Sequence, residues 1–272
     1  MSDRDYVLGT HDAELVRLGV QHAAWRDTVL ACWQRAGIKP GARVADVGCG
    51  PGYATRDLAT LVGPEGHVVA IDRSRRFIEA ARETLPRERR GQVEFHERDL
   101  MQAPLPAQEL DAVWCRWVAC FVESPARLVD RMLAALRPGG VAIFHEYVAY
   151  ETYGPVGRSP KLTEFVAEVM ASWREAGGEP NIARQLPQLL SEHGATVVDL
   201  EPHLFCVTAA DPMWAWPIGF METNLERMVD TGTVDPAWAE AARAELKALC
   251  ADDAAAMLTP TVLEIIAQKD AA

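Results

Sequence analysis

Apolar runs alternate with amphipathic stretches through the first half of the chain. The runs cover 44–47, 66–72, 92–96, 110–118 and 141–147, and most are rich in β-branched and aromatic residues. This composition favours strands that are buried on both faces of a sheet. Between the runs, apolar residues recur every three or four positions, which is typical of helices that cover a sheet. The alternation predicts an α/β fold built on a parallel sheet.

A helical segment precedes the first predicted strand. Its apolar residues recur at near-helical spacing over residues 6–36, and Gly37 with Pro40 and Gly41 ends the pattern. We therefore expect an N-terminal helical cap over residues 1–39, followed by the main domain over residues 40–272.

The second half of the chain leaves the simple alternation. Helical patterns cover residues 160–176, 181–193 and 211–258, whereas residues 195–200 and 261–267 are rich in β-branched residues. The last two segments complete a set of seven predicted strands. The residues before the last strand, about 202–259, are expected to form a helical lid.

Composition and charge exclude several classes of function. Apolar residues make up 49% and charged residues 24% of the chain, and the net charge is −12. Because nucleic-acid binding needs clustered Lys and Arg, this charge argues against DNA or RNA as the partner. No apolar run approaches membrane-spanning length, so we expect no membrane insertion.

The cysteines favour a cytoplasmic protein. Six cysteines are scattered along the chain without a C-x-x-C pair, and the N-terminus lacks an apolar signal core. We interpret them as reduced thiols. The sequence shows no cluster with metal-ligand spacing, so we predict no metal site.

A glycine-rich turn follows the first predicted strand. Gly48, Gly50 and Gly52 stand at alternate positions, with Asp46 two residues before the first of them. Glycines allow positive φ and remove the Cβ atoms, so a ligand can lie against the main chain. The helix that begins near Tyr53 directs free N–H groups at such a ligand, which favours a carboxylate or phosphate. A plain glycine turn is the alternative interpretation.

The spacing of this turn resembles motif I of class I S-adenosylmethionine-dependent methyltransferases. It reads G-x-G-x-G, not the dinucleotide-binding G-x-G-x-x-G. A second marker, D-A-V at 111–113, L-R-P-G-G at 136–140 and I-F at 143–144, is similar to ubiquinone- and menaquinone-biosynthesis-like methyltransferases of type 11. The resemblance covers about residues 40–150 and the last strand. It implies a Rossmann-like, seven-stranded, mostly parallel sheet flanked by helices, with the last strand antiparallel beside the fifth.

An acidic residue ends the second predicted strand. Asp72 stands about 20 residues beyond the glycine turn, where a carboxylate reaches ribose hydroxyls in a doubly wound sheet. The alternative role is a helix N-terminal acid, for which Ser74 is an equally good cap.

The resemblance implies S-adenosylmethionine as the cofactor. The glycine turn would lie against its methionine part, Asp46 would reach the amino group, and Asp99 with Leu100 would meet the adenine. The expected cofactor-binding residues are Gln21, Asp46, Gly48, Cys49, Gly50, Asp72, Arg73, Asp99, Leu100 and Arg116. Gln21 belongs to the cap, whose helix is expected to close over the site.

The predicted function is in-line methyl transfer to a small, largely apolar organic acceptor through oxygen, nitrogen or carbon. A general base is needed only if the acceptor must lose a proton. His145, near the carboxyl end of the fifth strand, is the candidate base, and a structural histidine is the alternative. Aromatic residues of the predicted lid, such as Trp216 and Phe220, suit either a pocket or a core.

Two other functions remain open at this stage. A nicotinamide-dependent oxidoreductase uses a similar sheet, although the turn spacing disfavours it. A protein that binds S-adenosylmethionine without catalysis would carry the same motifs. These motifs concern the cofactor alone, so they predict neither the acceptor nor the oligomeric state.

Overall fold

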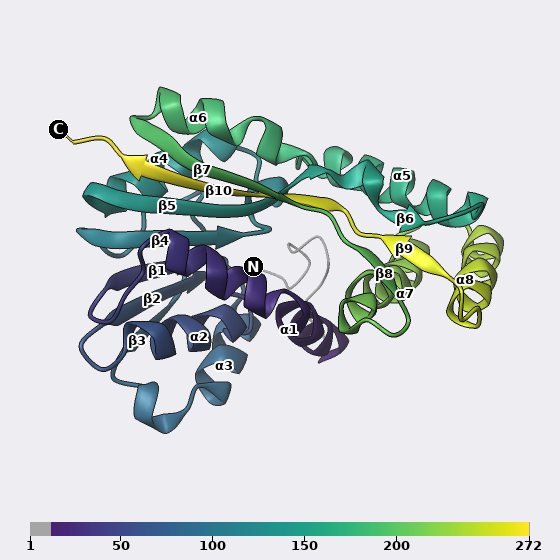
Figure 1. Ribbon diagram of the computed structural model, residues 1–272, viewed down its shortest axis with the longest axis horizontal. Coiled ribbons are helices and arrows are strands. Elements are labelled where there is room, and N and C mark those ends of the chain that lie inside the picture. The colour runs from purple at the N-terminus through teal and green to yellow at the C-terminus, as the bar shows by residue number, and fades with distance from the viewer. Residues whose placement is uncertain (1–11, 272) are drawn as a thin grey trace.

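The computed structural model describes residues 12–271 and is organised around a seven-stranded sheet (Figure 1). The strand order is β3-β2-β1-β4-β5-β10-β7. The strands are β1 (Arg43–Val47), β2 (His67–Asp72), β3 (Val93–Glu97), β4 (Leu110–Arg116), β5 (Leu136–Ala149), β7 (Ala195–His203) and β10 (Thr261–Lys269). Strands β1 to β5 are parallel to one another, whereas β10 runs antiparallel between β5 and β7. The predicted fold class is therefore confirmed, including the antiparallel last strand.

Helices cover both faces of this sheet. The flanking helices are α2 (Tyr53–Val62), α3 (Arg75–Thr84), α4 (Pro125–Ala135) and α6 (Leu186–Glu192). Figure 1 shows α2 and α3 on one face and α4 and α6 on the other. Ser74 caps α3 by accepting a hydrogen bond from the Phe77 N–H, and Ser124 caps α4 in the same way. Phe77, Ile78 and Ala81 are buried, as their helical spacing predicts.

An extension lies at the end of the sheet opposite the C-terminus (Figure 1). It contains the helices α5 (Pro160–Glu175), α7 (Ala215–Asp230) and α8 (Pro236–Cys250). It also contains a second sheet formed by β6 (Gly154–Pro155), β9 (Ala256–Leu258) and β8 (Cys206–Thr208). The prediction of helix throughout 211–258 was therefore wrong for 256–258. A strand of three residues is too short to show a periodicity. Its pairing partners also come from distant segments, so the neighbouring sequence does not reveal it.

Helix α1 (Asp12–Arg35) packs against α7 and α2. Its own residues Trp25, Val29 and Trp33 are fully buried. The predicted beginning of this helix, at residue 6, lies outside the described residues, and the boundary of the cap at residue 39 stays a prediction. Between residues 12 and 271, no helix has both the length and the apolar character needed to cross a membrane.

Gly48 occupies a position that only glycine suits. Its φ is +67°, and a Cβ atom there would lie 2.1 Å from Cγ2 of Val118. Gly37 has a similar φ of +76°, but no atom lies within 4 Å of the place of its Cβ. A side chain would strain the backbone at both glycines, but it would clash with a neighbour only at Gly48.

We predict that Gly48→Ala destabilises the protein more than Gly37→Ala does. Positive φ costs an alanine about 1–2 kcal/mol at either position, and the clash with the stiff Val118 side chain adds about 1–3 kcal/mol at Gly48. Denaturant unfolding measures both variants. The added loss should shrink when Gly48→Ala is combined with Val118→Ala, and equal losses for the two glycines would contradict the prediction.

Candidate functional site

A large cavity opens at the carboxyl ends of the parallel strands. It encloses about 1430 Å³, part of which is open to solvent. Its lining comes from the loops after β1, β2, β3 and β4, from the end of β5, and from α1, α5 and α7. Open α/β sheets bind ligands at this edge. All ten predicted cofactor-binding residues belong to this lining.

Hydrogen bonds from the main chain hold the glycine turn in place. The N–H groups of Gly48 and Cys49 donate to the Ile71 carbonyl at 2.8 and 3.0 Å. The Gly50 N–H donates to Oδ2 of Asp72 at 2.9 Å. No heavy atom lies within 4 Å of the place where a Gly50 Cβ would stand. The turn is therefore fixed to the end of β2 while its main chain remains accessible from the cavity.

Asp72 joins the glycine turn to the start of α3. Its Oδ1 accepts from the Ser74 N–H at 2.8 Å, and its Oδ2 accepts from Gly50. Burial raises the pKa of this carboxyl group. Each carboxylate oxygen has more than one lone pair, so these contacts leave acceptor capacity for a ligand. Asp72 thus braces the turn while it faces the cavity, and Arg73 beside it lies at the rim.

Asp99 and Leu100 form the part of the lining that follows β3. The Asp99 Oδ1 accepts from the Met101 N–H at 2.7 Å, which closes a tight turn. The Leu100 side chain is buried. An acceptor side chain and an apolar surface therefore stand next to each other, as the binding of a planar heterocycle requires.

Asp46 is a buried carboxyl group on the floor of the cavity. Only 2% of its surface is exposed, and its Oδ2 accepts a hydrogen bond of 2.6 Å from Oγ1 of Thr55. Burial raises the pKa of Asp46 to about 6, against the lowering effects of the Thr55 hydroxyl and the charge of Arg116. A positively charged group of a ligand would therefore stabilise the ionised form of Asp46.

Arg116 extends from the end of β4 into the same region. Its Nη2 lies 3.0 Å from Nδ1 of His22 on α1. Its Nη1 is buried and has no hydrogen-bond partner among residues 12–271. Burial lowers the pKa of Arg116 to about 10, while the charge of Asp46 acts in the opposite direction. A buried guanidinium donor without an acceptor is costly, and an anionic ligand group would complete it.

Gln21 connects two of the helices around the cavity. Its Oε1 accepts from Nη1 of Arg17 at 2.9 Å and from Nε1 of Trp216 at 3.0 Å. The first bond lies within α1 and the second reaches α7. Gln21 therefore lines the cavity and also holds α1 against α7.

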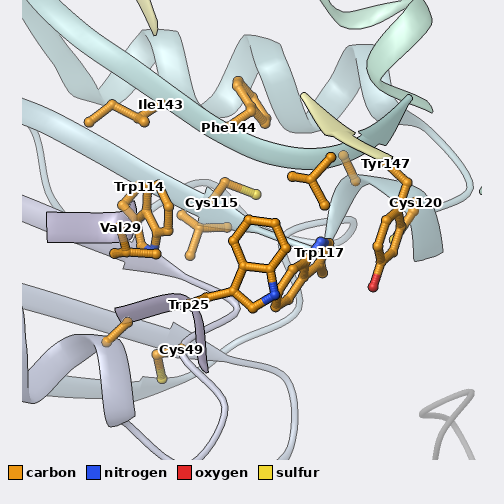
Figure 2. Packing of buried hydrophobic residues seen from close by; sticks show 14 of the residues in the cluster. Trp25, Val29, Cys49, Trp114, Cys115, Trp117, Cys120, Ile143, Phe144 and Tyr147 are labelled. Atoms are coloured by element: carbon orange, nitrogen blue, oxygen red, sulfur yellow. The ribbon is translucent and has the colours of Figure 1, made fainter. Parts of the chain in front are cut away.

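Aromatic rings form the opposite wall. Trp117 stacks between Tyr147 and Trp216, with ring centroids 5.7 and 5.6 Å away. Figure 2 shows Trp117 between Trp25 and Tyr147. Trp117 has a φ of +52°, which is rare for a bulky residue and marks local strain. Further rings of the lining come from Trp173 on α5 and Phe220 on α7.

Several of these rings were not predicted as site residues. Tyr147 and Trp173 were assigned only to the predicted strand and helix, since each fits an ordinary buried position. The location of Tyr147 at the carboxyl end of β5 is the one available signal. Phe220 lines the cavity, whereas Trp216 supports it from behind the stacked Trp117.

Glu146 supports the loop after β4 and was also missed. It is fully buried, and its Oε1 accepts from the N–H groups of Val118 and Ala119, both at 2.8 Å. The Cys120 thiol also interacts with this carboxyl group. Burial raises the pKa of Glu146 to about 7. This carboxyl group therefore fixes the strained loop that carries Trp117.

His145 lies outside the lining of the cavity. It is fully buried, its Nε2 is 2.7 Å from Oε2 of Glu264, and its ring contacts Trp25 and Trp114. Burial lowers its pKa well below the ordinary value. Its role as a general base stays a prediction, and these contacts give it the structural role that was the alternative.

Glu264 gathers several ionisable groups behind His145. Its Oε1 accepts from Nη2 of Arg35, and its Oε2 also lies 3.3 Å from Nε2 of His203. Ligand atoms of Cys32, His145 and Glu264 lie within 4.8 Å of one another, a proximity that the sequence did not reveal. Arg35 also pairs with Asp199 and Glu201, so it offsets only part of the negative charge around this cluster.

Comparison with known proteins identifies relatives of the central segment. Residues 45–144 match the family model described as a methyltransferase domain. A ubiquinone/menaquinone biosynthesis C-methyltransferase of Ectopseudomonas mendocina is 30% identical over 130 residues, which are 47% of this chain and 50% of the relative. A trans-aconitate 2-methyltransferase of Azoarcus is 38% identical over 107 residues, which are 39% of this chain and 40% of the relative. The chain thus matches half or less of the length of these curated relatives.

Solved structures extend the similarity to the whole chain. A phosphoethanolamine N-methyltransferase of Haemonchus contortus, solved in complex with S-adenosyl-L-methionine, superposes with a TM-score of 0.59. The match covers 99% of this chain and 60% of that one at 18% identity. At this identity the likeness concerns the fold alone.

The buried Glu146 should make stability depend on pH. The pKa is about 7 in the folded protein and ordinarily 4.5, so the folded chain binds more protons between these values. The contribution of Glu146 to the free energy of unfolding therefore falls as pH rises from about 4.5 to 7. We predict that Glu146→Gln removes about 1–3 kcal/mol of this fall.

Chemical unfolding at a series of pH values measures this effect. Glu175→Gln, on the exposed end of α5, is the matched control and should retain the wild-type pH dependence. Identical pH dependence of Glu146→Gln and the wild type would disprove the prediction.

Proposed function

Since residues 45–144 form a class I S-adenosylmethionine-dependent methyltransferase domain, we propose that this protein methylates a small organic acceptor. The observation that carries the proposal is that one cavity is lined by the glycine turn, by an acidic residue at the end of each of three strands, and by a buried arginine. These residues are Asp46, Asp72, Asp99 and Arg116. Nothing in the comparisons favours the nicotinamide-dependent or the non-catalytic alternative.

The residues present fit S-adenosylmethionine. The open main chain at Gly50 can accept the methionine part without obstruction from a side chain. Arg116 offers a buried unpartnered donor to the carboxylate, and Asp46 offers an acceptor to the amino group. We assign Asp72 to the ribose hydroxyls, and Asp99 with Leu100 to the adenine. These assignments rest on the chemistry of each side chain and on its place in the lining.

When bound, S-adenosylmethionine supplies a methyl group that is already activated on a sulfonium centre. The protein then has to hold the acceptor in line and keep water out. The stacked rings of Trp117, Tyr147 and Trp216 provide a rigid surface for this purpose. Gln21 and Trp216 join α1 to α7 beside it, which supports our proposal that residues 202–259 form a lid and that α1 closes over the site.

The aromatic wall favours a largely apolar acceptor. Pockets for such ligands are mostly apolar with a few polar groups, and Tyr147 and Trp173 with Phe220 match this description. The relatives named for quinone biosynthesis and for trans-aconitate also support a small molecule. We propose an oxygen, nitrogen or carbon atom as the methylated centre.

Charge and cysteine state support a cytoplasmic enzyme that does not act on nucleic acid. The chain has a net charge of −12, which disfavours a polyanionic substrate. All six cysteines are free, and four of them are buried. Free thiols are typical of a reducing compartment.

Calorimetric titration with S-adenosylmethionine, S-adenosylhomocysteine and NADH tests the proposal. We expect micromolar binding of the first two and none of the third. Binding of NADH alone would support the oxidoreductase instead. Transfer of labelled methyl to a panel of quinones, phenols, carboxylic acids and amines tests catalysis, and cofactor binding without transfer to any class would favour the non-catalytic alternative.

Asp72→Asn tests the proposed ribose contact. One carboxylate oxygen becomes an amide donor, so we expect the binding of S-adenosylhomocysteine to weaken by about 1–3 kcal/mol. Asp253→Asn, at an exposed site before β9, is the control and should bind like the wild type. Unaltered affinity of Asp72→Asn would contradict the assignment.

A further inference from the structure

We propose, on the basis of the function proposed above, that His22 is a positioning residue that holds Arg116 toward the carboxylate of the cofactor. His22 itself does not line the cavity, so it acts through Arg116. The proposal stands on hydrogen-bond geometry that joins α1, α2 and β4. It assigns a function to a residue of the N-terminal helix that no binding motif includes.

The contacts of His22 determine its tautomer. A guanidinium group only donates hydrogen bonds, so Nδ1 of His22 must accept the 3.0 Å bond from Nη2 of Arg116. The other ring nitrogen, Nε2, lies 3.1 Å from Oδ2 of Asp57. That oxygen is a carboxylate acceptor, so Nε2 carries the proton. His22 is therefore a neutral imidazole with its hydrogen on Nε2.

Neighbouring groups hold this tautomer in place. Arg26 donates to both oxygens of Asp57 at 2.7 and 3.1 Å and keeps that carboxylate ionised. The Tyr53 ring stacks on the imidazole with a centroid distance of 6.1 Å and an angle of 19°. Burial, as the main cause, and the charge of Arg116 lower the pKa of His22. The neutral form that the geometry requires is thus also the form that the surroundings favour.

The bond to His22 restricts where Arg116 directs its remaining donors. With Nη2 held on the α1 side, Nη1 is left buried and unpartnered while the side chain lines the cavity beside Asp46. The pair then offers a donor and an acceptor close together, which complements the carboxylate and amino groups of an amino acid. Without the acceptor at Nδ1, the guanidinium would keep its contacts over the Trp117 and Trp114 rings, at 5.0 and 5.9 Å, but these contacts do not direct its individual N–H groups.

The same arrangement depends on how α1 is seated. The Tyr53 hydroxyl donates to the Leu15 carbonyl at 3.0 Å, and a Cβ at Gly19 would stand 2.9 Å from that hydroxyl oxygen. Helix α1 thus approaches the start of α2 closely, one turn before His22. The placement of His22 against Arg116 follows from this close approach.

Two ligands separate a positioning role from a structural one. S-adenosylhomocysteine carries the amino-acid carboxylate, whereas 5′-methylthioadenosine keeps the adenosine part and lacks it. We expect His22→Leu to raise the Kd of S-adenosylhomocysteine about tenfold, as is typical when a charge-assisted hydrogen bond is weakened. The Kd of 5′-methylthioadenosine should change by less than about twofold, since no carboxylate is present.

A conservative variant and a control complete the titrations. In His22→Asn, Oδ1 replaces the acceptor at Nδ1, so the affinity for S-adenosylhomocysteine should return to within about threefold of the wild type. His193→Asn, at an exposed histidine after α6, should bind both ligands like the wild type. Equal weakening of both ligands by His22→Leu, or no weakening of either, would overturn the proposal.

Nitrogen-15 NMR of the histidine rings gives an independent readout. We expect His22 in the complex with S-adenosylhomocysteine at pH 7 to be neutral with its proton on Nε2. A doubly protonated ring or a proton on Nδ1 would overturn the proposal. If the wild type binds neither ligand, the proposed function fails first. Binding of both ligands with no effect of His22→Leu contradicts the role of His22 alone.

Discussion

The site depends on the burial of opposite charges at the carboxyl ends of neighbouring strands. Asp46 lies near the end of β1 and Arg116 is the last residue of β4, and these two strands are paired in parallel. Burial raises the pKa of the acid to about 6 and lowers that of the base to about 10, so each group stabilises the other's charge only in part. The charges therefore do not fully compensate each other, and Nη1 of Arg116 is left without a partner among the described residues. A zwitterionic ligand group would resolve it, which explains why the protein tolerates the cost.

Elements far apart in the sequence hold the residues around the cavity in place through hydrogen bonds. Helix α1 supplies His22 to Arg116 and Gln21 to Trp216, so it joins the charged floor to the aromatic wall. Glu146 fixes the strained loop after β4 from below, through the N–H groups of Val118 and Ala119. The cavity is therefore held by buried hydrogen bonds on both sides of its central loop, and the glycine turn provides its open edge.

The sequence predicted the part of the site that consists of the glycine turn and the acidic residues at the strand ends. A glycine turn and acids at strand ends have fixed spacing, so Gly50, Asp72 and Asp99 were found in the lining without a structure. The seven strands followed from periodicity for the same reason. The small sheet was missed because β9 has three residues and pairs only with distant segments. Tyr147 was missed because an aromatic residue suits any position of a buried strand, and Glu146 was missed because its partners, the N–H groups of Val118 and Ala119, lie in a loop far away in the sequence.

His145 illustrates why strand alternation predicts a face but not a depth. Alternation places His145 and Tyr147 on one face of β5, and the structure agrees. Yet the two residues are two positions apart along the strand, and of the two only Tyr147 lines the cavity. His145 instead meets Glu264, which is its register partner on the antiparallel β10. The last strand therefore decides which side chains of β5 face solvent or ligand and which are paired within the sheet. Residue chemistry alone favoured the histidine, whereas its antiparallel neighbour supplied the carboxylate that binds it.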